Sequence, residues 1–306
     1  MNQPHILKNA LEKEFNIEIS DMEKLDIGYS NEVFSAKIGD KQTIIRLSKK
    51  KQTYPMEVFV YKELAKRGIP VPKIYYHKEN PKNLEWPVMI VQKFSDDILG
   101  EIALDANTEK NLYRNAGTLL KKIHEYKIEG FGDLIIDGKH LKGKYDTPKE
   151  FWNARTKEHT IYQYLKDLLT NNLVDKSTYE LVLQSFNDLC GLQLPEAVFV
   201  HGDFHQDHIF TDLKRITGVI DISNGFAGDP RYDIAYTLFF LNTKQRESFL
   251  EGYGVPFPDE ILLKYLIFIA GEKISWRYKK GNMEGVKVAK DVLDNAIEIY
   301  TNYVNS

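Results

Sequence analysis

The sequence contains a single cysteine, Cys190, among its 306 residues. One thiol excludes an internal disulfide and is typical of a protein in a reducing compartment. The first twenty residues lack the continuous apolar segment of a signal peptide, because charges are mixed through their apolar positions. They predict an amphipathic helix instead, and we expect a soluble, cytoplasmic protein.

Long apolar runs and a charge excess of one sign are missing as well. The longest apolar stretch, residues 261–270, is interrupted by Lys264 and is too short to span a bilayer. Lys and Arg number 41 against 44 Asp and Glu, for a net charge of -3, whereas nucleic-acid-binding proteins usually concentrate basic residues. With 42% hydrophobic and 28% charged residues, the composition is that of a globular protein. We expect a monomer with no membrane or nucleic-acid partner.

The residues that are present divide the chain into two regions. Up to about residue 94, strands are predicted in 24–39, 41–49 and 86–94, and an amphipathic helix in 54–69. From about residue 105 the apolar spacing is mainly helical, with short strand-like segments at 197–202 and 215–223. The sequence therefore predicts an α+β fold with a small antiparallel sheet lobe, residues 1–94, and a larger, mostly helical lobe, residues 95–306.

The segment HGDFHQDHIF, residues 201–210, gathers three histidines and two aspartates directly after the apolar run AVFV. That run predicts a buried strand, so the segment should be the loop that leaves it, with Gly202 permitting a tight backbone turn. The residues that follow predict a hairpin whose second strand ends at Asp221. We therefore expect Asp203 and Asp221 at the mouths of adjacent strands, with His208 on the same loop as Asp203.

Two carboxylates and an imidazole around one cavity can hold a divalent metal. Mg²⁺ prefers carboxylates together with phosphate oxygens and needs few protein ligands. Zn²⁺ also binds His and Asp, but no His/Cys spacing typical of a closed zinc site occurs here. A polar loop with capping aspartates is the remaining interpretation, and this segment alone leaves it open.

The segments HGDFHQDHIF and GVIDISNGFAGDPRYDIAY together resemble the double signature of the aminoglycoside phosphotransferase family. In that family a loop of the form H-G-D-x-x-x-x-N is followed by a strand ending in I-D and then by G-D-P-x-x-D. The resemblance extends to GYSNEVFSA, TIIRLSKK and LLKKIHEYKIEGFG. It implies a bilobal, protein-kinase-like fold. It also implies nucleoside-triphosphate-dependent transfer of a phosphoryl group to a hydroxyl of a small molecule. We expect this small molecule to be an aminoglycoside-type antibiotic.

The resemblance also implies roles for individual residues. Asp203 would position the acceptor hydroxyl and accept its proton, while His208 and Asp221 would hold Mg²⁺. The nucleotide, ATP or GTP, would be bound by the phosphate-covering loop, the Arg–Glu pair and the hinge, that is by Ser30, Asn31, Arg46, Glu57, Gln92 and Phe94. Phosphoryl transfer depends mainly on positioning and charge neutralisation, which residues of these types can supply.

Three positions depart from the family pattern. His208 stands where the family usually has an Asn as second metal ligand, although an imidazole nitrogen can also ligate a metal. Arg46 replaces the more familiar Lys, which keeps the charge but offers a planar fork of donors. The turn at Gly28 lacks a G-x-G-x-x-G pattern, so the phosphate-covering loop is assigned by its position alone.

The acceptor is less well defined than the reaction. Aminoglycosides are polycations, so their pocket should be rich in carboxylates. The acids that could supply it are Asp96, Asp97, Glu101, Asp207 and Glu272. A macrolide or another small metabolite is an alternative acceptor. A catalytically silent nucleotide-binding protein and a protein kinase are two further alternatives, but both aspartates are retained and little room for a peptide platform follows Asp221.

Overall fold

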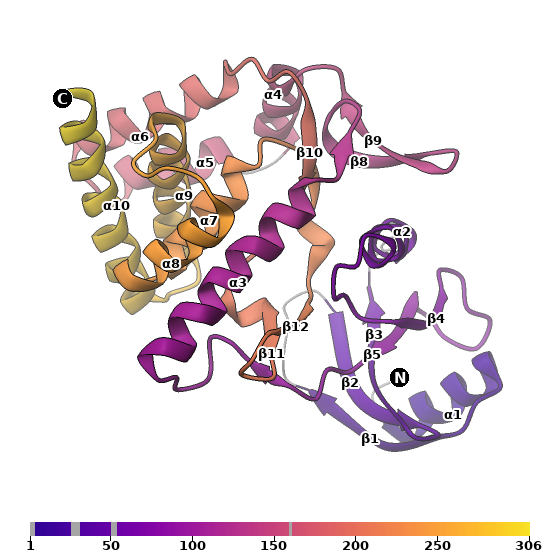
Figure 1. Ribbon diagram of the computed structural model, residues 1–306. Helices are drawn as coiled ribbons and strands as arrows, with labels where there is room; N and C mark the ends of the chain where they lie inside the picture. Colours follow the sequence, from indigo (N-terminus) through magenta and orange to yellow (C-terminus); the bar gives the residue numbers. More distant parts are fainter. Residues whose placement is uncertain (1–3, 26–30, 50–53, 159–160) are drawn as a thin grey trace. The chain divides into compact units, whose positions relative to one another are not determined.

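The computed structural model describes residues 4–25, 31–49, 54–158 and 161–306 (Figure 1). Its backbone packing forms two compact units. The N-terminal unit comprises residues 1–101 together with 209–222, and the C-terminal unit comprises residues 102–208 together with 223–306. Ser30, predicted to contact the nucleotide, lies outside the described residues.

The N-terminal unit contains a five-stranded antiparallel sheet in the order β1-β2-β3-β5-β4. Its strands are β1 (Ile19–Leu25), β2 (Asn31–Ile38), β3 (Lys41–Ser48), β4 (Ile74–Lys78) and β5 (Val88–Gln92). Strands β2 and β3 form a hairpin with Ile38 opposite Lys41, and Gly39 supplies the positive φ of 57° that this short turn requires.

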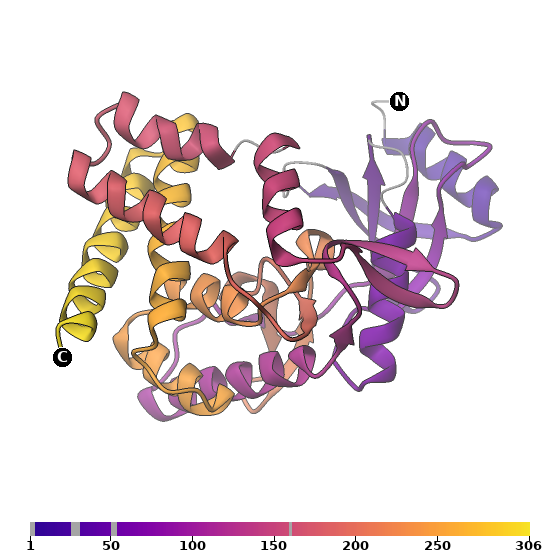
Figure 2. The same ribbon diagram turned by 90° about the horizontal axis from the view of Figure 1, so that it is seen from above.

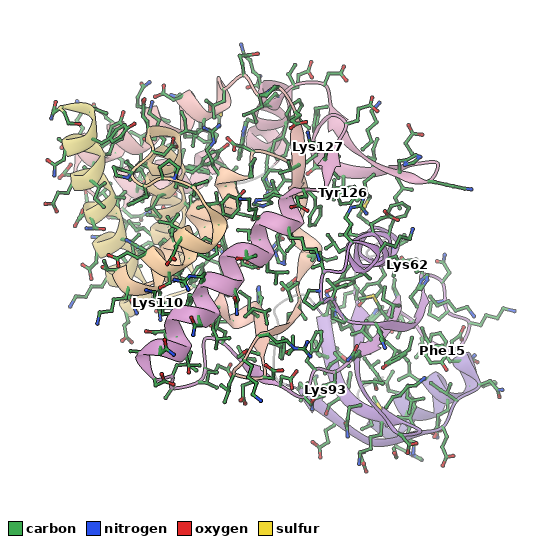
Figure 3. All side chains as sticks on the ribbon, viewed as in Figure 1. Phe15, Lys62, Lys93, Lys110, Tyr126 and Lys127 are labelled. Carbon is green, nitrogen blue, oxygen red and sulfur yellow. The ribbon has the colours of Figure 1, made fainter. Side chains whose placement is uncertain are left out.

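Two helices accompany this sheet, α1 (Pro4–Phe15) and α2 (Tyr54–Lys66). Leu7 and Leu11 of α1 join a cluster of buried strand residues that includes Phe34 and Ile45. Phe15, at the end of α1, packs against Tyr76 with ring centroids 5.2 Å apart (Figure 3). The expected amphipathic N-terminal helix is therefore confirmed, and its apolar side covers the sheet.

A second, small sheet in the N-terminal unit has the order β12-β11-β6. It consists of β6 (Asp97–Ile98), β11 (Ile209–Thr211) and β12 (Ile216–Val219). The ring of Phe94 lies 4.9 Å from that of Phe210, and a Cβ atom on Gly218 would approach the Phe94 ring to 2.6 Å. The β11–β12 hairpin pairs with β6 and therefore packs with the N-terminal unit. This arrangement differs from the expected division of the chain at residue 94.

The C-terminal unit combines a sheet in the order β7-β10-β13-β8-β9 with helices α3 to α10. The strands are β7 (Lys127–Ile128), β8 (Phe131–Asp137), β9 (His140–Tyr145), β10 (Ala197–Val200) and β13 (Phe226–Gly228). The helices are α3 (Ala106–His124), α4 (Pro148–Glu158), α5 (Ile161–Thr170), α6 (Lys176–Cys190), α7 (Arg231–Phe240), α8 (Thr243–Tyr253), α9 (Glu260–Lys279) and α10 (Met283–Val304).

Helix α9 is at the centre of the helical part, where it packs against α5, α6, α7 and α10 (Figure 2). Most of its residues from Leu262 to Ser275 are buried, which explains why its sequence is apolar on nearly all sides. Among the helices of the described residues, none is long and apolar enough to cross a membrane.

The expectation that Asp203 and Asp221 follow adjacent strands is wrong. Asp203 follows β10, which pairs with β7 and β13, whereas Asp221 follows β12, which pairs with β11. The two strands thus belong to different sheets. The sequence between them does form the predicted hairpin, but its partner is β6, a strand of only two residues.

Two glycines set how closely α3 and α8 approach each other. A Cβ atom on Gly117 of α3 would lie 2.1 Å from the carbonyl oxygen of Phe249, and one on Gly252 of α8 would lie 1.9 Å from that of Arg114. Real Cβ atoms do not approach backbone oxygens so closely, so any larger residue at either position must separate the helices.

We therefore predict that Gly117→Ala lowers the free energy of unfolding by about 1–3 kcal/mol, the usual cost of overpacking. Gly191→Ala is the matched control, because Gly191 has an ordinary helical φ of -86° and its Cβ would meet nothing closer than 3.5 Å. Urea denaturation of both variants measures the difference. Equal effects of the two substitutions would show that the helices tolerate a wider separation.

Candidate active site

The loop after β10 is held by one buried carboxylate. Asp233 Oδ2 accepts the backbone N–H of His201 at 2.6 Å, and Oδ1 accepts that of Gly202 at 2.8 Å. Nε2 of His124 also lies 3.0 Å from Asp233 Oδ2, and its Nδ1 lies 2.8 Å from the Tyr253 hydroxyl. Asp233 therefore braces the loop, and α3, α7 and α8 all contribute residues to this support.

Gly202 makes the turn into this loop possible. Its φ is 81°, and a Cβ atom there would lie 2.3 Å from the carbonyl oxygen of Asn224. Both the backbone conformation and the close approach require glycine. The turn brings Asp203 out of the buried strand into a partly exposed position beside Asn224.

Asp203 is fixed by side chains from two other segments. The Tyr236 hydroxyl of α7 donates to Asp203 Oδ1 at 2.5 Å, and Asn224 Nδ2 donates to Oδ2 at 3.3 Å. Burial and the negative charge of Asp203 raise the pKa of Tyr236, so its hydroxyl stays protonated and acts as a donor. The Asp203 carboxylate is thereby oriented, and it is partly open to solvent.

Lys273 of α9 continues this network. Its Nζ donates to the Tyr236 hydroxyl at 2.6 Å and lies 4.5 Å from the centroid of the same ring. Burial lowers the pKa of Lys273, while Glu272 and Asp203 oppose that shift. Neither Tyr236 nor Lys273 was predicted from the sequence. Tyr236 could have been found, because it lies one helical turn after Asp233 and so on the same face of α7.

The three histidines of the loop differ in their surroundings. His201 is fully buried, and its Nδ1 accepts the Asp203 N–H at 3.3 Å, which makes it part of the loop's support. His205 stacks on Phe240 with ring centroids 4.4 Å apart. Burial, together with nearby His208, Lys273 and His201, lowers the pKa of His205 to about 2, so this ring is neutral.

A hydrogen bond of His208 fixes the orientation of its ring. Its Nδ1 lies 2.9 Å from the carbonyl oxygen of Asp203. Since a carbonyl only accepts, Nδ1 carries a proton, and in the neutral ring Nε2 is the nitrogen that could coordinate a cation. One ligand atom each of Asp203, His205 and His208 also fall within 4.8 Å of one another. A zinc ion on these three would sit next to the Lys273 ammonium, which opposes a dication there.

In the N-terminal unit, Arg46 of β3 forms an ion pair with Glu57 of α2, as expected. Burial opposes the charge on the guanidinium, but the carboxylate of Glu57 beside it raises the pKa of Arg46. Asp221 has a φ of 62°, and its charge acts on both Glu57 and Tyr61. The Arg46 guanidinium, the Glu57 carboxylate and the Asp221 carboxylate thus belong to the same unit.

The other predicted residues are distributed between the two units. The N-terminal unit also contains Asn31 at the start of β2, Gln92 at the end of β5, Phe94, Asp96, Asp97 and Glu101. The C-terminal unit contains Asp207 and Glu272 together with Asp203 and His208. Gln92 Oε1 faces the backbone N–H of Lys73 at 3.4 Å.

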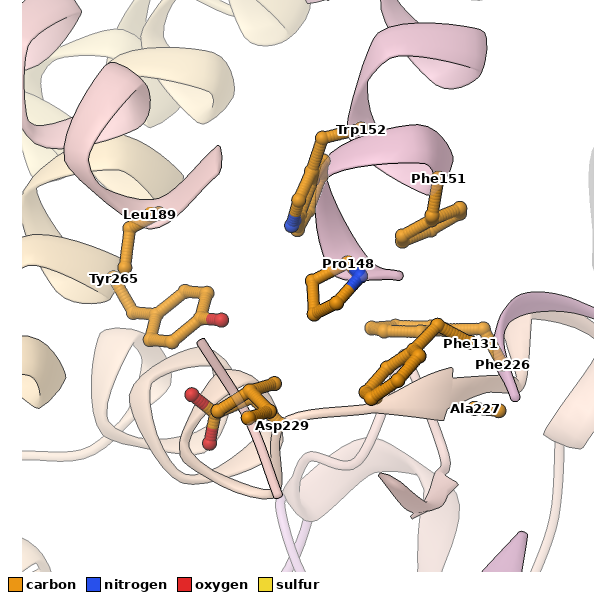
Figure 4. Close-up of a pocket in the computed structure, with 11 residues that line it drawn as sticks. Phe131, Pro148, Phe151, Trp152, Leu189, Phe226, Ala227, Asp229 and Tyr265 are labelled. Carbon is orange, nitrogen blue, oxygen red and sulfur yellow. The ribbon is translucent and has the colours of Figure 1, made fainter. Parts of the chain in front are cut away.

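A small apolar cavity lies elsewhere in the C-terminal unit (Figure 4). Aromatic side chains surround it, among them Phe151, Trp152 and Tyr265, and Asp229 forms part of its wall. Asp229 is bonded to Arg231, whose Nη2 lies 2.8 Å from Oδ2. The cavity measures about 10 Å³, which is room for one water molecule and not for an antibiotic.

Solved structures share this architecture. The ternary complex of the aminoglycoside phosphotransferase APH(4)-Ia with AMP-PNP and hygromycin B gives a TM-score of 0.74 at 21% identity, covering 95% of this chain and 97% of that one. The GDP and kanamycin complex of APH(2")-IIia gives 0.68 at 15% identity, covering 97% and 99%. The predicted protein-kinase-like α+β fold is therefore confirmed.

Residues 21–259 match the model of the Phosphotransferase enzyme family, and the chain belongs to this family. It is also similar to the hygromycin-B 4-O-kinase of Escherichia coli, with 25% identity over 248 residues, which cover 78% of this chain and 69% of that protein. The resemblance inferred from HGDFHQDH and GDPRYD is thereby confirmed.

We predict that Asp233→Asn disrupts the loop. Both oxygens of Asp233 accept a backbone N–H group, whereas the side chain of Asn has one oxygen and one NH2 group. One of the two backbone N–H groups would therefore face another donor and lose its acceptor. Each buried donor left without an acceptor costs about 1–3 kcal/mol. Asp175→Asn is the control, since Asp175 caps α6 at the surface by accepting the Thr178 N–H at 2.8 Å and Asn caps equally well. Urea denaturation compares the two. A loss no greater at Asp233 than at Asp175 would contradict the bracing role.

Proposed function

We propose that this phosphotransferase moves the terminal phosphoryl group of ATP or GTP to a hydroxyl of an aminoglycoside-type antibiotic. The observation that carries the proposal is the Asp203 carboxylate, oriented by Tyr236 and Asn224 on a loop that Asp233 braces. Such an arrangement suits a residue that positions an acceptor hydroxyl and accepts its proton. Membership of the family and the similarity to a hygromycin-B kinase support the same reaction.

On the donor side, Arg46 would neutralise nucleotide phosphates while Glu57 holds its guanidinium in place. Ser30 and Asn31 would contribute to the loop over the phosphates, and the backbone around Gln92 and Phe94 would bind the base. The ring of Phe94 is fixed between Phe210 and Gly218, which supports a well-defined hinge. Backbone groups can bind either base, so the proposed donor is ATP or GTP.

Mg²⁺ fits the donors that the chain offers. Nε2 of His208 and the carboxylate of Asp221 would hold the ion together with phosphate oxygens. The ion would neutralise charge on the phosphates during transfer. The residue that acts on the acceptor is Asp203, and it does so without being a ligand of the metal.

For the acceptor we propose a cationic, multiply hydroxylated molecule. Asp207 and Glu272 lie in the same unit as Asp203, and Asp96, Asp97 and Glu101 are further candidates. A charged hydrogen bond to one of these acids contributes roughly 1.5–3 kcal/mol. The aromatic rings of Phe240 and Trp276 near Lys273 favour a second candidate, an uncharged ring system such as a macrolide.

The setting we propose is the cytoplasm, which the single cysteine supports because it needs no oxidising compartment. ATP, GTP and Mg²⁺ would be available there. Modification of an antibiotic hydroxyl in that compartment would make the protein a resistance enzyme.

The direct test is nucleoside-diphosphate release with a panel of aminoglycosides, macrolides and small hydroxylated metabolites. We predict that Asp203→Ala lowers kcat on the accepted compound by about 100-fold or more, the usual contribution of a general base, with little change in nucleotide affinity. Asp137→Ala, at an exposed hairpin, is the control. Near-normal turnover of the Asp203 variant would refute its role, and turnover of macrolides alone would refute the cationic acceptor.

The metal assignment has its own test. We predict that Asp221→Ala weakens Mg²⁺–nucleotide binding and turnover together, because it removes the proposed metal carboxylate. His208→Asn should retain substantial activity, since Asn offers an oxygen ligand that Mg²⁺ prefers to nitrogen. Isothermal titration of Mg²⁺–nucleotide measures both variants. An unchanged affinity in the Asp221 variant would place the metal on other residues.

A further inference from the structure

A chain of hydrogen bonds leads from Asp203 into the core of the C-terminal unit. It passes from the Asp203 carboxylate to the Tyr236 hydroxyl at 2.5 Å and from there to Lys273 Nζ at 2.6 Å. Tyr236 belongs to α7 and Lys273 to α9, which pack against each other (Figure 1). Tyr236 and Lys273 therefore both lie on helices of the same unit rather than on loops.

Three aromatic rings surround the Lys273 side chain. Its Nζ lies 4.5 Å from the centroid of the Tyr236 ring, 5.8 Å from that of Phe240 and 5.7 Å from that of Trp276. Aromatic faces attract an ammonium, most strongly where water is excluded. Burial lowers the pKa of Lys273 and Arg277 adds to this shift, whereas the neighbouring Glu272 and Asp203 favour the charged form.

The chemistry of the three groups fixes the direction of each bond. An ammonium has donors only, so the Tyr236 oxygen accepts from Lys273. An ionised carboxylate has acceptors only, so the one proton of the Tyr236 hydroxyl must point to Asp203 Oδ1. Asp203 Oδ1 is thereby engaged by a short bond, while Oδ2 has longer contacts, at 3.3 Å with Asn224 Nδ2 and at 3.9 Å with His208 Nδ1.

We propose that Lys273 is a positioning residue that acts through Tyr236, fixing the tyrosine proton so that Asp203 presents Oδ2 to the acceptor. The proposal rests on the function proposed above for Asp203. When the acceptor oxygen forms its bond to the γ-phosphorus and the bond to the nucleoside diphosphate breaks, the hydroxyl proton passes to Oδ2. Without the lysine, the tyrosine proton can rotate away and the carboxylate loses its fixed orientation.

A kinetic double-mutant cycle tests this inference. Lys273→Met and Tyr236→Phe should each lower kcat by about 10- to 100-fold, the effect expected when a reacting group is misplaced, while KM for the nucleotide stays unchanged. In the Tyr236→Phe background, Lys273→Met should have little further effect, because its path to Asp203 is already missing. Lys273→Arg, which keeps a cationic donor, should retain more activity than Lys273→Met.

Lys264→Met provides a matched control. Lys264 is on the same helix and pairs with Asp188 at 2.8 Å and Glu260 at 2.7 Å. Its loss should lower the melting temperature without changing kcat. The proposal is overturned if Lys273→Met keeps wild-type kcat, or if it lowers kcat by the same factor with and without the Tyr236 hydroxyl.

A second measurement requires no acceptor. If Lys273 is coupled to the charge on Asp203, then Asp203→Asn and Lys273→Met should change the melting temperature non-additively, by about 2 °C or more. Additive effects would overturn the coupling. A wild-type protein that phosphorylates no compound in the panel, but shows this coupling, would instead refute the proposed acceptor class and leave the positioning network intact.

Discussion

The buried carboxylate of Asp233 is the interaction on which the arrangement of the site depends. It receives two successive backbone N–H groups, those of His201 and Gly202, at the point where β10 ends. Backbone donors buried at such a turn must find an acceptor or cost free energy. Because α7 supplies the acceptor, the helix that holds the loop is also the helix that carries Tyr236. Support of the loop and orientation of Asp203 therefore come from one rigid element.

The positive charge of Lys273 partly offsets the negative charge of the acidic residues at the candidate active site. Asp203, Asp207 and Glu272 would attract a polycation, but Lys273 lies two hydrogen bonds from Asp203. A substrate ammonium close to the reacting hydroxyl would meet this lysine, and Coulomb repulsion at about 5 Å costs roughly 3 kcal/mol at an effective dielectric constant of 20. An aminoglycoside bound here is therefore expected to turn its ammonium groups toward more distant acids and a neutral hydroxyl toward Asp203.

The sequence predicted the fold class, the Arg46–Glu57 pair and the loop after β10, because each depends on local pattern or on a motif with fixed spacing. The predictions from the sequence were wrong or incomplete where the structure depends on contacts between residues far apart in the chain. The partner of the β11–β12 hairpin is a strand of only two residues, Asp97–Ile98, which has no periodic signal. Lys273 was missed for the same reason, since it lies 37 residues from Tyr236 and on a helix that is apolar on nearly all sides.

The Arg46–Glu57 pair is better explained by the proposed binding of nucleotide phosphates than by a contribution to the stability of the fold. Removing two charges from water costs several kcal/mol for each ion, and their attraction often does no more than offset it. In the described part of the chain, Glu57 Oε2 is buried without a hydrogen-bond partner, and the charge of Asp221 acts on the same carboxylate. A cluster of this kind is costly in the absence of further positive charge. The cation proposed to accompany the nucleotide phosphates would supply that charge, so we expect the pair to be most stable with both bound.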